Sequence, residues 1–100
     1  MFNFENKVVL ITGGSRGLGK AMAEGFADAG AKVIITSRKL EACEALAQSI
    51  MDRGGEALAI AANTGSTDDL DRLVDDAIAH YGQVDILINN AGINIAMGAL

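Results

Sequence analysis

Apolar residues along this chain follow two alternating patterns, short continuous runs and stripes with helical spacing. The continuous runs are typical of strands covered on both faces, and they extend from Lys7 to Thr12, Lys32 to Thr36, Glu56 to Ala61 and Val84 to Ile88. Between them, apolar residues recur with the helical period and predict three helices. This regular alternation of strand and helix predicts an α/β fold with a parallel sheet.

Each expected helix has an apolar stripe and an end signal. The first ends at Gly30, the second ends at Gly54-Gly55, and the third begins at Ser66 or Thr67. Gly25 within the first helix costs about 1 kcal/mol relative to Ala, so we expect it to allow close approach to the sheet. The stripes comprise Leu18, Ala21, Met22, Gly25, Phe26 and Ala29, then Leu40, Cys43, Ala47, Ile50 and Met51, then Leu70, Leu73, Val74, Ala77, Ile78 and Tyr81.

The order of these elements predicts the topology of the sheet. Four strands joined by three right-handed helical crossovers give the order three, two, one, four, a doubly wound arrangement. The order reverses between strands one and four, and a ligand crevice is expected there. The outer side of strand four would then be an unpaired edge.

Composition narrows the class of protein. A chain of 100 residues forms at most one domain, and a net charge of -5 with eight basic residues gives no electrostatic footprint for nucleic acid. No apolar run approaches the roughly 18 residues that span a bilayer. Cys43 is the only cysteine and the first residues carry no secretory pattern, which favours a cytoplasmic protein. We predict no metal site and no membrane partner.

A glycine-rich segment, Thr12 to Gly19, follows the first strand. Glycines at 13, 17 and 19 allow a tight turn and bring backbone N–H groups toward a pyrophosphate at the start of the next helix. A turn with no ligand is one alternative. A nucleotide triphosphatase P-loop is another, but Ala21 stands where that motif needs Ser or Thr to hold Mg²⁺.

A second such segment, Asn89 to Gly92, follows the fourth strand. The carboxyl ends of neighbouring parallel strands meet at one edge of a sheet. Together, the two segments therefore describe both walls of a dinucleotide crevice.

The end of the second strand bears on the choice between nicotinamide cofactors. An Asp or Glu there would bind the ribose 2′-hydroxyl of NAD, but this chain has Ser37, Arg38 and Lys39, with no acid before Glu41. One hydrogen bond to a charged group is worth about 1.5–3 kcal/mol, so Arg38 could favour NADP over NAD roughly 10- to 150-fold. Arg16 could face the same phosphate.

These motifs together resemble the short-chain dehydrogenase/reductase family of the NADP-dependent type, over nearly the whole chain. The resemblance implies a Rossmann-type fold of which residues 1–100 are the N-terminal cofactor-binding portion, incomplete relative to the family. It also implies hydride transfer between NADP and a small alcohol or ketone, in a parent protein that forms a homo-oligomer.

The resemblance also implies roles for individual residues. Thr12 would brace the second glycine segment, Asn89 would steady the sheet, and the segment after it would line the adenosine ribose. Asn63 stands where the family usually has an Asp beside the adenine, and it can still accept that hydrogen bond. The implied cofactor-binding residues are Gly13, Ser15, Arg16, Gly17, Leu18, Gly19, Ser37, Arg38, Asn63, Thr64, Asn90, Ala91 and Gly92.

The family's catalytic Asn, Ser and Tyr-x3-Lys have no counterpart among these 100 residues. Tyr81 is followed four places on by Asp85, so we assign neither Tyr81 nor His80 a catalytic role. We expect this chain alone to show no dehydrogenase turnover. A non-catalytic dinucleotide-binding module is the second hypothesis.

Overall fold

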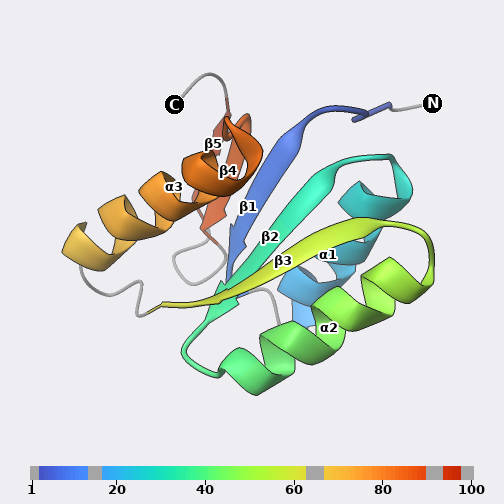
Figure 1. Cartoon of the computed structure of the whole chain (residues 1–100), viewed down its shortest axis with the longest axis horizontal. Helices are drawn as coiled ribbons and strands as arrows, with labels where there is room; N and C mark the ends of the chain where they lie inside the picture. Colours follow the sequence, from blue (N-terminus) through green and yellow to red (C-terminus); the bar gives the residue numbers. More distant parts are fainter. Residues whose placement is uncertain (1–2, 14–16, 63–66, 90–93, 98–100) are drawn as a thin grey trace.

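The computed structural model describes residues 3–13, 17–62, 67–89 and 94–97, and only the backbone of residues 67, 68, 89 and 94–97. Strands and helices alternate in the predicted order (Figure 1). The strands are β1 (Val8–Thr12), β2 (Lys32–Ser37), β3 (Glu56–Ala61), β4 (Ile86–Asn89) and β5 (Asn94–Met97), and the helices are α1 (Gly17–Asp28), α2 (Leu40–Asp52) and α3 (Thr67–Tyr81).

The strands form one sheet in the order β3-β2-β1-β4-β5. The first four pair in parallel, which confirms the predicted doubly wound order three, two, one, four. Pairing aligns Thr12 with Thr36 on one side and with Asn89 on the other, while Thr36 faces Ile60. The carboxyl ends of all four parallel strands therefore lie at the same edge.

The prediction of an unpaired edge at β4 is wrong. β5 pairs with β4 in the antiparallel direction, aligning Ile88 with Ile95 and Asn89 with Asn94. An antiparallel neighbour needs only a short connection, whereas another parallel strand would need a crossover of a dozen or more residues. The chain thus covers β4 with the residues that directly follow it.

Helices cover both faces of the sheet, with α1 and α2 on one side and α3 on the other (Figure 1). All five residues of β1 are buried, as its continuous apolar run predicted. The buried cluster under α1 and α2 includes Val9, Ile11, Ala23, Ala27, Val33, Ile35, Cys43, Leu46, Ala47 and Ile50. The cluster under α3 consists of Val8, Leu10, Ile34, Leu73, Ala77 and Val84.

The buried face of α1 differs from the predicted stripe. Gly19, Ala23 and Ala27 are its buried residues, whereas Leu18 and Gly25 are exposed. These three buried side chains are small, so the helix meets the sheet through a row that needs little space. Nothing lies within 4 Å of a Cβ built on Gly25, so the expected close approach at that residue is also wrong.

α1 ends at Asp28, two residues before Gly30, the residue that was predicted to end it. The φ of Gly30, +101°, lies in the left-handed region that disfavours other residues, and a Cβ there would stand 3.0 Å from Cγ of Glu5. The N-terminal segment passes close by, because the Phe4 N–H donates to the Ala29 carbonyl at 2.9 Å. The rings of Phe4 and Phe26 meet edge to face, with centroids 5.2 Å apart.

Tyr81 lies at the amino edge of the sheet, the edge opposite the glycine-rich segments. The Lys32 ammonium lies 5.6 Å from the centroid of its ring. Burial, followed by the charge of the Glu56 carboxylate and a hydrogen bond to it, raises the pKa of Tyr81 from 10.0 to about 12. This residue therefore links the end of α3 to the starts of β2 and β3.

Alanine replacement of two glycines is expected to change stability in opposite directions. Gly25→Ala should raise the free energy of unfolding by about 0.5–1 kcal/mol, because alanine is the better helix former and the site is exposed. Gly30→Ala should lower it by about 1–3 kcal/mol, because its positive φ becomes strained. Urea denaturation measures both, and a destabilised Gly25→Ala variant would contradict this placement of α1.

Removal of the Tyr81 hydroxyl should change stability at high pH. Between pH 10.0 and about 12, folded Tyr81 keeps a proton that the unfolded chain has lost. The contribution of this proton to the stability of the folded state is therefore complete below pH 10.0 and declines as pH rises toward 12. Urea midpoints across this range should fall less steeply in Tyr81→Phe than in the wild type. Equal slopes would exclude the Tyr81 proton as the cause.

Candidate functional site

The carboxyl edge of the sheet holds the strand ends from which the segments singled out by the sequence continue. Thr12, Ser37, Ala61 and Asn89 are the last residues of β1 to β4. The order of strands reverses around β1, which has β2 on one side and β4 on the other. In open α/β sheets, ligands bind at this edge beside such a reversal.

Two glycines shape the described part of the first turn. Gly13 has a φ of +64° and Gly17 a φ of +62°, conformations that favour glycine. The Gly13 N–H donates to the Thr36 carbonyl at 2.7 Å, so Gly13 shapes the turn with its N–H committed to the sheet. The predictions for Ser15 and Arg16 lie outside the described residues.

The helix that follows this turn begins at Gly17. The first N–H groups of a helix lack acceptors within it, and the helix dipole favours an anion at this end. Gly19 is buried against the sheet, while Leu18 is 65% exposed. The start of α1 therefore combines a buried glycine with an exposed leucine in its first turn, and its N–H groups could bind a pyrophosphate.

Thr12 joins the ends of β1 and β4. Its side chain is fully buried, and its hydroxyl donates to the Ile88 carbonyl at 3.4 Å. The role implied for Thr12, bracing the segment from Asn89 to Gly92, concerns residues that lie mostly outside the described ranges and stays a prediction. The predictions for Asn90, Ala91 and Gly92 lie outside the described residues.

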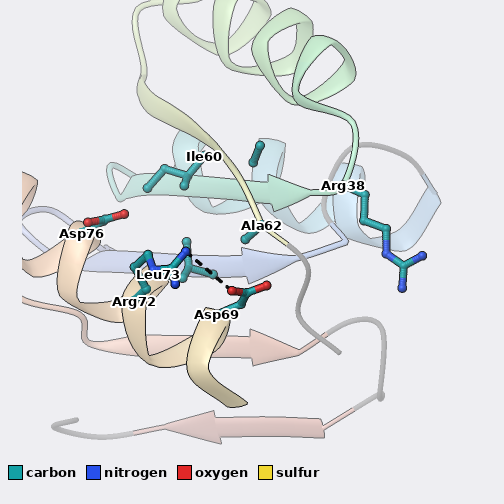
Figure 2. A pocket seen from close by; sticks show the side chains of 8 residues that line it. Arg38, Ile60, Ala62, Asp69, Arg72, Leu73 and Asp76 are labelled. Atoms are coloured by element: carbon teal, nitrogen blue, oxygen red, sulfur yellow. Dashed lines mark ion pairs between the residues drawn. The ribbon is translucent and has the colours of Figure 1, made fainter. Parts of the chain in front are cut away.

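The turn after β2 presents Arg38 to solvent. The Lys39 N–H donates to the Ser37 hydroxyl at 3.1 Å, and the Ser37 hydroxyl approaches the Lys39 carbonyl at 3.2 Å. Arg38 stands between these two linked residues, and Figure 2 shows its side chain extending away from the sheet. Its guanidinium has no ion-pair partner among the described side chains.

A cavity of about 320 Å³ opens beside Arg38, between the end of β3 and the first turns of α3 (Figure 2). Its floor is apolar, and its α3 wall carries an ion pair between Arg72 and Asp69 at 3.7 Å. The lining residues are Arg38, Ile60, Ala61, Ala62, Asp69, Arg72, Leu73 and Asp76. The cavity therefore offers an apolar surface with charged groups at its rim.

The end of β3 is fixed to the turn after β2, because the Ala62 N–H donates to the Ser37 carbonyl at 3.0 Å. Asn63 and Thr64, the predicted adenine contacts, come directly after Ala62 but lie outside the described residues. No group of His, Cys, Asp or Glu side chains in the described ranges is arranged to hold a metal ion. None of the described helices is long and apolar enough to cross a membrane.

Two residues near this edge, which the apolar patterns placed in a helix stripe and a strand, have side-chain environments that those patterns do not predict. Cys43 is fully buried, and its Sγ lies 3.1 Å from the Ser37 hydroxyl. Thr36 is also fully buried, and its hydroxyl is the single buried side-chain polar atom in the described chain without a hydrogen-bond partner. Both depend on side-chain positions that periodicity does not specify.

Comparison with known families matches the chain to one of them. The sequence model of the short chain dehydrogenase family matches residues 7–99. The chain belongs to the short-chain dehydrogenase family. This match favours neither the non-catalytic binding module nor the P-loop alternative.

Named relatives include reductases. The chain is 43% identical over 90 residues to a probable tetrahydroxynaphthalene reductase of Zymoseptoria tritici, covering 89% of this chain and 34% of the relative. It is 40% identical over 88 residues to a 3-oxoacyl-[acyl-carrier-protein] reductase of Synechocystis, covering 87% and 36%. The chain thus spans about a third of the length of these relatives.

Solved structures share the fold. A hydroxysteroid dehydrogenase from Escherichia coli matches with a TM-score of 0.86 and 39% identity, covering 90% of this chain and 37% of that one. A metagenomic short-chain oxidoreductase in complex with NADP matches with a TM-score of 0.80 and 32% identity, covering 84% and 38%. The described architecture is therefore that of the family's nucleotide-binding fold.

Replacement of Thr12 and of Thr36, which pair across β1 and β2, by valine should change stability in opposite directions. Thr36→Val removes a buried hydroxyl that lacks a partner and should raise the free energy of unfolding by about 1–3 kcal/mol. Thr12→Val removes a hydroxyl bonded to the Ile88 carbonyl and should lower it by about 0.5–1.5 kcal/mol. Thermal and urea unfolding measure both. Destabilisation by Thr36→Val would mean that its hydroxyl has a partner.

Proposed function

We propose that this chain binds NADP(H) as the N-terminal nucleotide-binding portion of an oxidoreductase. The parent protein transfers a hydride between the nicotinamide and a small alcohol or ketone. Membership in the short-chain dehydrogenase family and the reductases among the relatives support this class of reaction. A relative whose structure contains NADP supports the choice of cofactor.

The single observation that carries the proposal is that a glycine turn and Arg38 both lie at the carboxyl edge of the sheet. Arg38 has no ion-pair partner among the described side chains. Gly17 begins α1 with a φ of +62°, a conformation that favours glycine, and it adds no Cβ of its own at the helix N-terminus. Arg38 projects from the adjacent strand end (Figure 2). A pyrophosphate at the first position and a 2′-phosphate at the second would each meet a group of suitable charge.

The cavity beside Arg38 supports a position for the adenosine part. Its volume of about 320 Å³ is open to solvent, and Ile60 and Ala62 give it an apolar wall. An adenine ring could lie on this wall, and Asn63 and Thr64, which follow Ala62 in the sequence, remain the adenine contacts that we propose. Arg38 at the rim would then face the ribose and its phosphate.

Within this proposal, the residues of the chain bind and orient the cofactor. When bound, NADPH supplies the hydride. The turn at Gly13 and Gly17 would fix the pyrophosphate, and Thr12 would hold the end of β4 against β1. We propose the same binding role for Ser15, Arg16, Asn90, Ala91 and Gly92, as the family resemblance implies, and assign no proton transfer to this chain.

The proposal predicts a loss of cofactor discrimination when Arg38 is removed. Arg38→Ala should weaken NADP⁺ binding roughly 10- to 150-fold, because one charge-assisted contact to the 2′-phosphate is lost. Binding of NAD⁺, which lacks that phosphate, should change less than about 2-fold. Isothermal titration calorimetry on the 100-residue chain measures both affinities.

Lys39→Ala is the matched control, because it removes the neighbouring cation and leaves Arg38 in place. It should retain most of the preference for NADP⁺. Equal weakening of both nucleotides in Arg38→Ala, or no weakening of either, would contradict the assignment of Arg38. Absence of binding to either nucleotide by the wild type would contradict the proposed function.

A further inference from the structure

The Ser37 hydroxyl is the centre of a small set of contacts at the turn that presents Arg38. It accepts a hydrogen bond from the Lys39 N–H at 3.1 Å. It also lies 3.2 Å from the Lys39 carbonyl and 3.1 Å from Sγ of Cys43. The Ser37 hydroxyl therefore has its hydrogen-bond partners within the turn and on α2.

Cys43 supplies the contact that reaches this turn from α2. Its side chain is fully buried, and it belongs to the cluster between the sheet and the helices α1 and α2. A hydroxyl has one proton, so if Ser37 donates to the Lys39 carbonyl, the Cys43 thiol is the donor to Ser37. If Ser37 instead donates to sulfur, Cys43 is the acceptor. Either arrangement fixes the hydroxyl to the helix.

The backbone of the same turn is fixed from the other sides. The Ser37 carbonyl accepts the Ala62 N–H at 3.0 Å, and the Thr36 carbonyl accepts the Gly13 N–H at 2.7 Å. The end of β2 is thus bonded to both neighbouring strand ends. Beyond Ser37, the Cys43 N–H donates to the Lys39 carbonyl at 3.4 Å, and the Ser37 hydroxyl adds the side-chain contacts that join the turn to the Cys43 thiol.

We infer that Cys43 is a positioning residue for cofactor selectivity, holding the Ser37 hydroxyl so that the turn presents Arg38 to the 2′-phosphate. This inference rests on the proposed function. Cys43 itself is buried, so we assign it no direct contact with the cofactor. Its effect reaches the phosphate through Ser37 and the backbone of Arg38, and a charged hydrogen bond depends steeply on the placement of its donor.

Removal of the thiol should therefore reduce the preference for NADP⁺ rather than nucleotide binding in general. Cys43→Ala should weaken NADP⁺ binding about 2- to 12-fold, the range expected for one neutral hydrogen bond, with NAD⁺ binding nearly unchanged. Cys43→Ser keeps a hydroxyl at the position and should restore most of the preference. Calorimetry on the 100-residue chain with both nucleotides measures the ratio.

Ala47→Gly is the matched control for a loosened helix. Ala47 is buried one turn further along α2 and belongs to the same core cluster. The change should lower thermal stability while leaving the ratio of NADP⁺ to NAD⁺ affinity as in the wild type. An equal fall of this ratio in Ala47→Gly and Cys43→Ala would assign the effect to stability and overturn the inference.

A double-mutant cycle tests the route through Ser37. Once Ser37→Ala is present, Cys43→Ala should have little further effect on the affinity ratio, because both changes remove the same contact. Additive effects would overturn the inference. Hydrogen exchange gives a readout without nucleotide, since Cys43→Ala should speed exchange of the Lys39 amide. Unchanged exchange would also overturn it.

The outcomes separate the two proposals. A wild type that prefers NADP⁺, with the preference intact in Cys43→Ala, overturns the role of Cys43 and leaves the proposed function standing. A wild type without any preference overturns both the role of Arg38 and this inference. Binding of neither nucleotide overturns the proposed function and the inference together.

Discussion

The hydrogen bond from the Gly13 N–H to the Thr36 carbonyl, at 2.7 Å, ties the glycine turn to the neighbouring strand end. It follows the last residue pair between β1 and β2, at the carboxyl edge where both strands end. Gly13 itself has a φ of +64°, a conformation that favours glycine. The start of α1 and the turn that carries Arg38 are therefore built on one fixed pair of strand ends, and the proposed site depends on this bond.

The positive potential at the carboxyl edge comes from individual groups and not from the net charge of the chain. The chain carries a net charge of -5, so its overall field does not attract a phosphate-rich ligand. Two local sources of positive potential can act instead, the N-terminus of α1 and the exposed guanidinium of Arg38. An acidic protein can bind a polyanion in this way because the aimed groups act at contact distance, where the remote acidic residues are screened by salt.

Sequence periodicity predicted most of the fold because the sheet is covered on both faces. The run from Glu56 to Ala61 matched β3 residue for residue. It could not predict β5, whose pairing depends on an available neighbour rather than on its own pattern. The stripe of α1 was misplaced because Gly19 and the small alanines after it, rather than Leu18, face the sheet. At the site, motifs located the glycine turn and Arg38, but the contact of Cys43 with Ser37 depends on rotamers.

Nuclear magnetic resonance of the isotope-labelled chain, titrated with NADP⁺, tests the account most directly. Amide shifts should concentrate at the carboxyl edge, at Gly13, at the first turn of α1 and at Arg38, with little change near Tyr81 and Lys32 at the amino edge. The same titration with NAD⁺ should leave Arg38 less affected. Shifts concentrated at the amino edge, or no shifts at saturating nucleotide, would contradict the central claim.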